Sequence, residues 1–216
     1  MLNESGQLVV PLYHGTSSHY VDSIKNFGLG GVRDDVLFDK RILSALADRL
    51  SDRSNQTEWW ALNSIIVEPM LDQRVTDSGF NFRYGATYLT PSRSTALRYA
   101  TSNRMGSEYI STIHEAFIAL NSVNPLAASE IIPPEHGLRK IFDADHCPIV
   151  ISVRGLGVEM LRTEKGEKID RQLANMKKMK NDFAGVDAEA LWQQFNFEIS
   201  SPIPSSLLVF EYINNK

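Results

Sequence analysis

The chain has 216 residues, of which 43% are hydrophobic and 22% are charged. This composition is typical of a folded globular protein with a substantial core, and we expect a single domain with insertions. The formal net charge of −4 argues against strong non-specific nucleic-acid binding. A protein with this net charge can still have a local basic groove.

The first ten residues, MLNESGQLVV, have neither a basic start nor a sustained apolar run, so we expect no signal peptide. No later stretch is long and apolar enough to predict a membrane span. The single cysteine, Cys147, excludes an intrachain disulfide and a cysteine-based zinc site. These features predict a cytoplasmic protein with no membrane partner and no bound metal.

The first predicted element is a strand over residues 7–14, whose alternate apolar positions share one face and which ends at His14. The composition of residues 15–17 predicts a turn. Ser18 is then expected to cap a short helix that stops at Gly28, a residue suited to the position after a helix.

Apolar residues recur at helical spacing in residues 35–50, and a second helix is expected over residues 58–66. Both lie between strand motifs. We therefore interpret residues 33–66 as a helical insertion.

Residues 84–100, YGATYLTPSRSTALRYA, combine a strand end, a turn and a helix start. Thr90 supplies a capping hydroxyl, so a helix is expected to begin at Pro91. Tyr88 on the strand and Tyr99 on the helix would then face each other and form a slot for a flat ring. Taken alone, the two tyrosines fit core packing equally well.

A further helix is predicted over residues 109–120, followed by a loop that contains Pro125, Pro133 and Pro134. This section, near residues 108–140, resembles a second insertion.

The last third of the chain is predicted to contain a buried strand, two helical segments and two closing strands. The longer helix carries lysines near its C-terminal end, which suit the helix dipole and a solvated face. These elements are expected over residues 147–153, 166–183, 188–194, 194–199 and 206–213.

Three motifs follow one another along the chain: YHGT at residues 13–16, the unit from Tyr88 to Tyr99, and Glu198 within FNFEIS. Together they resemble the ADP-ribosyltransferase superfamily, and specifically its His-Tyr-Glu branch. That branch includes the poly(ADP-ribose) polymerase catalytic domain and the diphtheria-toxin-like enzymes. The resemblance covers these motifs and does not extend to the intervening helices.

The resemblance implies an α+β fold in which two facing, mostly antiparallel sheets form a cleft for NAD. It implies that the YHGT motif binds NAD through His14, Gly15 and Thr16, with His14 on the adenosine-side ribose and the Gly15 backbone on the nicotinamide carboxamide. A glycine permits this close approach of the backbone. Tyr88 and Tyr99 would enclose the nicotinamide ring.

One position departs from the family pattern. The polymerase-like members carry a serine three residues before the second tyrosine, where this chain has Ala96. Either Ser92 or Ser94 replaces that serine, or the pocket relies on Gly15 alone.

Two glutamates, Glu198 and Glu211, are candidates for the catalytic carboxylate. We favour Glu198 because a final strand of leucine and aromatic residues follows it, as in the family. Strand alternation also puts Glu198 on the face opposite Phe197 and Ile199. Glu211 is too close to the end of the chain for such a strand to follow.

The resemblance implies a mono-ADP-ribosyltransferase that uses NAD as substrate, with His14, Tyr88 and Glu198 as its catalytic residues. Glu198 would stabilise the positive charge that forms on the ribose as nicotinamide leaves. The acceptor is a protein or a nucleic acid, with the acidic net charge slightly favouring protein, and toxin and defence roles fit the family.

Three other functions stay open on the sequence alone. They are an RNA 2′-phosphotransferase, which shares the fold and an HGT-like motif, an NAD hydrolase, and a module that binds NAD or ADP-ribose without turnover. Tyr88 and Glu198 favour chemistry on NAD over phosphate transfer.

Overall fold

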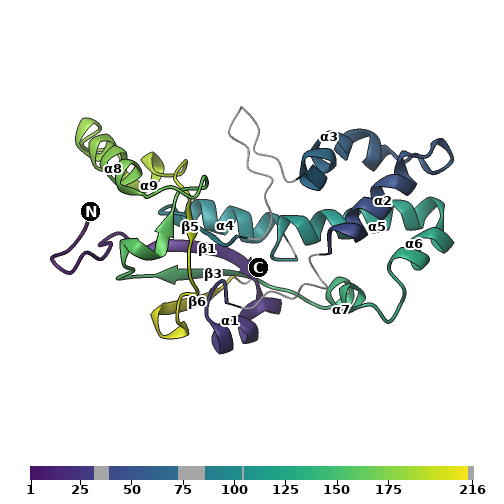
Figure 1. The fold of residues 1–216 in the computed structure, drawn as a ribbon, viewed down its shortest axis with the longest axis horizontal. Helices are drawn as coiled ribbons and strands as arrows, with labels where there is room; N and C mark the ends of the chain where they lie inside the picture. The colour runs from purple at the N-terminus through teal and green to yellow at the C-terminus, as the bar shows by residue number, and fades with distance from the viewer. Residues whose placement is uncertain (32–38, 73–85, 104, 214–216) are drawn as a thin grey trace. The chain divides into compact units, whose positions relative to one another are not determined.

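The computed structural model describes residues 1–31, 39–72, 86–103 and 105–213. The chain divides into two compact units (Figure 1). Unit 1 comprises Met1–Val32, Ala86–Gly106 and His146–Lys216, and unit 2 comprises Arg33–Gly85 and Ser107–Asp145. The two predicted insertions therefore form a compact unit of their own.

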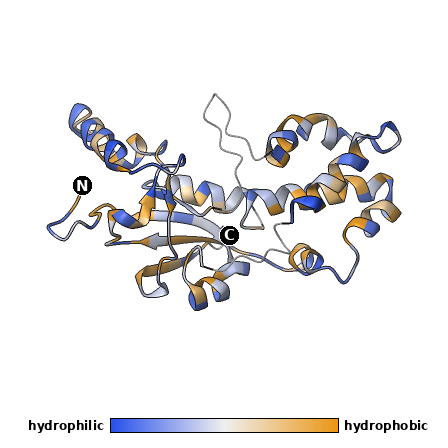
Figure 2. Cartoon of the chain, viewed as in Figure 1, coloured by the Kyte–Doolittle hydropathy of each residue, from blue (hydrophilic) through white to orange (hydrophobic). Residues whose placement is uncertain are grey.

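The described residues form an α+β protein with two small antiparallel sheets, both in unit 1. The first sheet has the strand order β1 (Leu12–Ser17), β3 (Pro148–Val153), β6 (Leu208–Tyr212). Figure 2 shows β3 as a mostly hydrophobic strand and β1 as a more polar one. The central position of β3 explains its continuous apolar sequence, and the strand predicted over residues 147–153 is confirmed.

The second sheet has the order β2 (Tyr88–Leu89), β5 (Phe197–Ile199), β4 (Leu161–Arg162). An isolated antiparallel bridge between Tyr13 and Thr90 connects it to the first sheet. Sequence analysis did not predict β4, because two residues are too few to carry a period-2 pattern.

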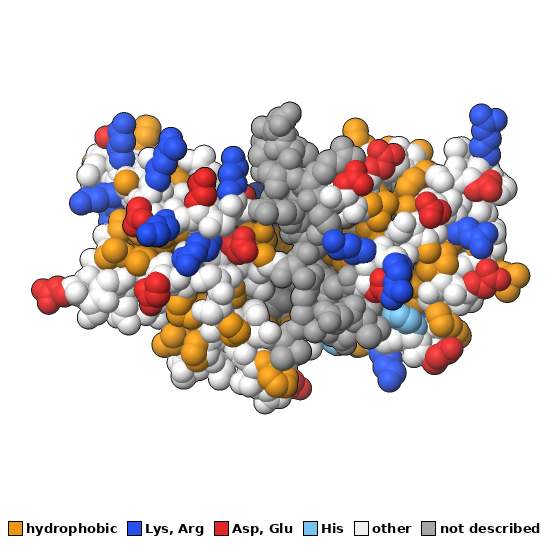
Figure 3. All heavy atoms as spheres, viewed as in Figure 1, with side chains coloured by type: hydrophobic (Ala, Val, Ile, Leu, Met, Phe, Trp, Pro, Cys, Tyr) orange, Lys and Arg blue, Asp and Glu red, His pale blue; other side chains and the backbone are white. Residues whose placement is uncertain are grey.

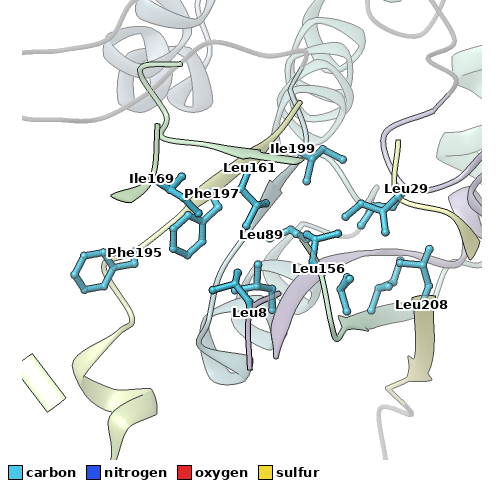
Figure 4. Packing of buried hydrophobic residues seen from close by; sticks show 14 of the residues in the cluster. Leu8, Leu29, Leu89, Leu156, Leu161, Ile169, Phe195, Phe197, Ile199 and Leu208 are labelled. Atoms are coloured by element: carbon cyan, nitrogen blue, oxygen red, sulfur yellow. The ribbon is translucent and has the colours of Figure 1, made fainter. Parts of the chain in front are cut away.

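The second sheet buries one of its faces in the core of unit 1. Leu89 is the register partner of Phe197, and Leu161 is the partner of Ile199. All four side chains are buried and pack together (Figure 4). Full burial of one such side chain stabilises the fold by about 1.5–3 kcal/mol. The buried side chains therefore determine which face of each strand points to the core.

Unit 1 also contains several helices. The short helix predicted to stop at Gly28 is confirmed: a 3-10 turn at Ser18–Tyr20 precedes α1 (Val21–Phe27), which Gly28 follows with φ +83°. The predicted cap is wrong, because Ser17, not Ser18, accepts the capping hydrogen bond from the His19 N–H. The others are α4 (Arg93–Ser102), α8 (Asp170–Asp182) and α9 (Ala188–Leu191). Of these, α4 packs against β1 and β3.

Unit 2 is entirely helical in its described residues. It contains α2 (Lys40–Ser51), α3 (Glu58–Asp72), α5 (Glu108–Val123), α6 (Pro125–Ile131) and α7 (Gly137–Asp143). The helix α2 packs against α3, α5 and α6. The amphipathic spacing correctly predicted α2, α3 and α5, although residues 35–38 of the first prediction lie outside the described residues.

The predicted strand over residues 7–14 is wrong at both ends. The strand begins at Leu12 and continues to Ser17, so the turn predicted at residues 15–17 is part of β1. Pairing with β3 extends as far as Ser17 opposite Pro148. This non-local pairing overrides the turn-like composition of Gly15 to Ser17.

The predicted helix start at Pro91 is also wrong. The Thr90 N–H donates to the Tyr13 carbonyl at 2.9 Å, and the Thr90 carbonyl accepts from the Tyr13 N–H at 2.8 Å. The chain is therefore still extended at Thr90. The cap is Ser92 instead, whose Oγ accepts a hydrogen bond from the Thr95 N–H. The helix therefore begins at Arg93.

Two predictions in the second half of the chain need correction. The proline-rich loop contains α6, because Asn124 caps a helix whose first residue is Pro125. The helix predicted from Gly166 begins only at Asp170, because Thr163 to Glu167 form a closed turn. Across the part of the chain that the structure describes, no helix has the length and apolar character needed to cross a membrane.

Candidate functional site

Every residue of the three motifs lies in unit 1, so the candidate site belongs to one compact body. Its side chains come from β1, β2, β5 and α4. In chain order they are His14, Gly15, Thr16, Tyr88, Ser94, Tyr99 and Glu198.

Tyr88 and Glu198 are direct neighbours in the second sheet. They are register partners across β2 and β5, and Arg162 of β4 is the partner of Glu198 on its other side. Directly opposite residues have their Cβ atoms about 4.5–5.5 Å apart. All three side chains are half-buried and stand on the face opposite the core residues. The prediction that Glu198 faces away from Phe197 and Ile199 is confirmed.

His14 joins the first sheet to Tyr88. Its Nδ1 lies 2.9 Å from the Tyr88 carbonyl oxygen. A carbonyl oxygen can only accept a hydrogen bond, so Nδ1 carries the ring proton and is the donor. Burial lowers the pKa of His14, partly offset by this hydrogen bond. At neutral pH the ring is therefore uncharged, and its Nε2 is a hydrogen-bond acceptor.

This burial predicts a pH-dependent stability. The pKa of His14 lies below 6.5 in the folded chain, so the unfolded chain binds the proton more readily. The stabilising contribution of the neutral His14 ring is fully present above pH 6.5, the ordinary pKa of histidine, and is lost as the pH falls below 6.5. We expect the free energy of unfolding to drop by up to about 1.4 kcal/mol per pH unit in that window.

Urea denaturation of the natural chain and of His14→Asn, between about pH 8 and pH 5, measures this effect. The asparagine N–H can still donate to the Tyr88 carbonyl but does not titrate, so the variant should have a flatter pH profile. Equal slopes for the two proteins would contradict the lowered pKa of His14.

Gly15 lies where β1 meets both the second sheet and α4. Tyr13 directs its N–H and C=O to Thr90, away from β3. Because the backbone groups of a strand alternate between its two edges, the N–H and C=O of Gly15 point to the same edge of β1 as those of Tyr13. A Cβ at Gly15 would lie 2.1 Å from the Ala96 carbonyl oxygen and 2.9 Å from the Ala100 nitrogen. Only a glycine allows α4 to approach this closely.

Thr16 is buried, and its hydroxyl donates to the Gly106 carbonyl at 3.4 Å. This long contact ties the loop after α4 to β1. In this structure Thr16 therefore contacts the protein's own backbone.

The two serines that are candidates to replace the family serine lie at the start of α4. Ser92 is fully buried and caps the helix. Ser94 is exposed, and its backbone N–H donates to Glu189 of α9 at 2.6 Å. The two hydroxyls are 3.0 Å apart. The capping role of Ser92 leaves Ser94 as the serine with an accessible hydroxyl.

Ala96 and Tyr99 lie on the same helix with different surroundings. Ala96 is buried against β1, and Tyr99 is 38% exposed. A residue three positions along a helix is displaced by about 60° around its axis. The arrangement of Tyr88 and Tyr99 around a nicotinamide ring stays a prediction.

Glu211, the other candidate glutamate, lies in the first sheet on β6. It forms an ion pair with Arg93 at the start of α4, and its second oxygen accepts from Arg93 Nε at 3.3 Å. Glu211 thus has a structural partner, while Glu198 is the glutamate beside Tyr88.

Sequence analysis missed Arg162, which the register makes a neighbour of Glu198. Its Nη1 donates to the carbonyls of Glu159 and Leu161, at 3.0 and 2.7 Å. These bonds fix the guanidinium close to its own backbone. Because β4 is so short, no local pattern marked this residue.

Within the described ranges, no group of three or more His, Cys, Asp or Glu side chains is arranged to hold a metal ion. The observed class is an α+β protein in which the His14 ring contacts the Tyr88 backbone, and Tyr88 is the cross-strand partner of Glu198. Comparisons with family models, curated proteins and solved structures find no match to this chain.

Proposed function

We propose that the chain is a mono-ADP-ribosyltransferase, which cleaves NAD between nicotinamide and ribose and transfers ADP-ribose to a macromolecular acceptor. The observation that supports this most is the position of Tyr88. Its carbonyl accepts the hydrogen bond from His14, and Glu198 is its cross-strand partner. Three motifs far apart in sequence are thereby adjacent in one unit.

In this proposal the two sheets face each other across the NAD cleft, and each residue has a separate task. The neutral His14 accepts a hydrogen bond from a ribose hydroxyl through Nε2. The Gly15 N–H and C=O bind the amide of nicotinamide, and Ser94 assists in place of the missing serine. Tyr88 and Tyr99 stack on the nicotinamide ring.

The reaction breaks the bond between the ribose C1′ carbon and the nicotinamide nitrogen. The electron pair of that bond leaves with nicotinamide, and positive charge develops on the ribose. Glu198 stabilises this charge, as carboxylates do in glycoside cleavage. An oxygen or nitrogen of the acceptor then bonds to C1′ and loses its proton to Glu198 or to water.

The test is nicotinamide release from NAD by the purified chain, with a macromolecular acceptor fraction supplied. We expect steady release, with ADP-ribose label appearing on the acceptor. Binding of NAD without release would instead identify a non-catalytic module. Release with free ADP-ribose as the sole product would identify an NAD hydrolase.

A further inference from the structure

About a third of the Lys and Arg residues of this chain, seven of 22, lie in one short segment of unit 1. Residues 162–180 contain seven Lys and Arg against three Asp and Glu, a net charge of +4. The whole chain has a net charge of −4, so the rest of it carries −8. A local positive field therefore exists on an otherwise acidic protein.

Six of these cations are exposed, and we call them the basic surface: Lys165, Lys168, Arg171, Lys177, Lys178 and Lys180. The helix α8 buries Leu173 and Met176 on its inner side, which leaves its cations facing solvent. Figure 3 shows Lys and Arg side chains gathered over α8. Among the described residues, none of the six lies within ion-pair distance of a carboxylate.

The basic surface is attached to the strand of Glu198 from two directions. Arg162 is the cross-strand partner of Glu198, and the turn that follows it carries Lys165. On the other side, Gln172 of α8 donates to the Asn196 carbonyl at 3.4 Å, one residue before β5 begins. Both connections lie within unit 1, so the basic surface borders the candidate site.

The strand order separates this surface from the adenosine end of NAD. His14 lies on β1, and the second sheet continues from β2 through β5 to β4. If His14 holds the adenosine-side ribose, then Arg162 and the basic surface lie beyond Glu198 on the opposite side. We assign that side to the acceptor.

The chemistry of the basic surface fits a nucleic acid better than a protein partner. Protein interfaces are depleted in lysine at their centre, whereas phosphate backbones are bound by Lys, Arg and Asn side chains. Asn175 and Asn181 are also exposed on α8. Phe183, directly after the helix, is 53% exposed. An exposed aromatic ring beside a row of cations is suited to stacking on an unpaired base.

We propose that the basic surface binds a single-stranded nucleic acid, with its phosphates on the cations of α8 and a base on Phe183, and that this strand is the ADP-ribose acceptor. The binding part is independent of the proposed function. The acceptor part rests on the proposed function.

The binding test uses fluorescence anisotropy with labelled single-stranded RNA and DNA of about 20 nucleotides, without NAD, over a range of salt concentrations. The variant Lys177→Gln/Lys178→Gln/Lys180→Gln removes three charges. We expect the natural chain to bind, and the variant to bind on the order of tenfold more weakly. Loss of three phosphate contacts should also reduce the slope of log K against log salt concentration by about 2, at about 0.7 for each contact on a single strand.

The matched control, Lys40→Gln/Arg53→Gln/Lys140→Gln, removes three exposed charges from unit 2 and should bind like the natural chain. Phe183→Ala should weaken binding without changing the salt dependence. Absence of binding, or equal weakening in both triple variants, would overturn the proposal. So would competition by poly-glutamate as effective as that by the oligonucleotide.

The acceptor part is tested by transferring label from NAD in the presence of the same RNA or DNA. We expect label that nuclease removes and protease does not, and less of it with the α8 variant while nicotinamide release persists. Label that protease removes would show a protein acceptor and overturn this part. Oligonucleotide binding without any nicotinamide release would overturn the proposed function and leave the binding surface intact.

Discussion

Replacing Glu198 by glutamine is expected to lower the rate of nicotinamide release by on the order of 10²–10³. Glutamine keeps the size and hydrogen-bonding capacity of the side chain but removes the negative charge. The charge matters most when the ribose becomes positive, which occurs in the transition state and not in bound NAD. NAD binding, measured by calorimetry, should therefore change little.

The natural control for this experiment is Glu211→Gln. Glu211 is the other candidate glutamate, and its partner is Arg93 in the first sheet. We expect this variant to retain the activity of the natural chain, with at most a small loss of stability, because exposed ion pairs contribute roughly 0–1 kcal/mol. A large loss of activity in Glu211→Gln with preserved activity in Glu198→Gln would reverse the assignment.

Replacing Gly15 by alanine is expected to cost about 3 kcal/mol of stability, at the upper end of the range for overpacked cores. The new Cβ would lie 2.1 Å from the Ala96 carbonyl oxygen. That atom belongs to the backbone of α4, so the clash cannot be relieved by rotating a side chain. The midpoint of urea denaturation measures the loss, and activity should fall with it, because α4 carries Tyr99.

Gly185→Ala is a suitable comparison. A Cβ at Gly185 meets no atom within 4 Å, although its φ is +99°. Only the backbone cost of an L residue at positive φ applies there, about 1 kcal/mol. Equal stability of the two variants would show that α4 can move away from β1.

The prediction for Glu198 shows what a local pattern can establish. Alternation along β5 sets the face on which Glu198 stands, because Phe197 and Ile199 must both be buried and a strand has a period of two. A different local signal, an unbroken apolar run, predicted β3. Helical spacing likewise predicted α2 and α5, since each buries an apolar side. It also predicted the first part of α3, whose buried residues, Val67 and Met70, lie beyond the predicted range.

The element boundaries near the site were harder to predict from sequence. Gly15 has the composition of a turn, yet it lies within β1 because β3 pairs beyond it. Thr90 has the features of a helix cap, yet its backbone is paired with Tyr13. In both cases a partner far away in sequence decides the backbone conformation, and a single segment carries no sign of that partner.

By itself, the sequence therefore determined the apolar periods, the order of the three motifs and the face of Glu198. Only the tertiary structure decided that Tyr88 adjoins both His14 and Glu198, that Arg162 is the second neighbour of Glu198, and that Glu211 pairs elsewhere. The physical reason is that burial follows from each residue's own position in a periodic element, whereas pairing depends on two segments that meet only when the chain is folded.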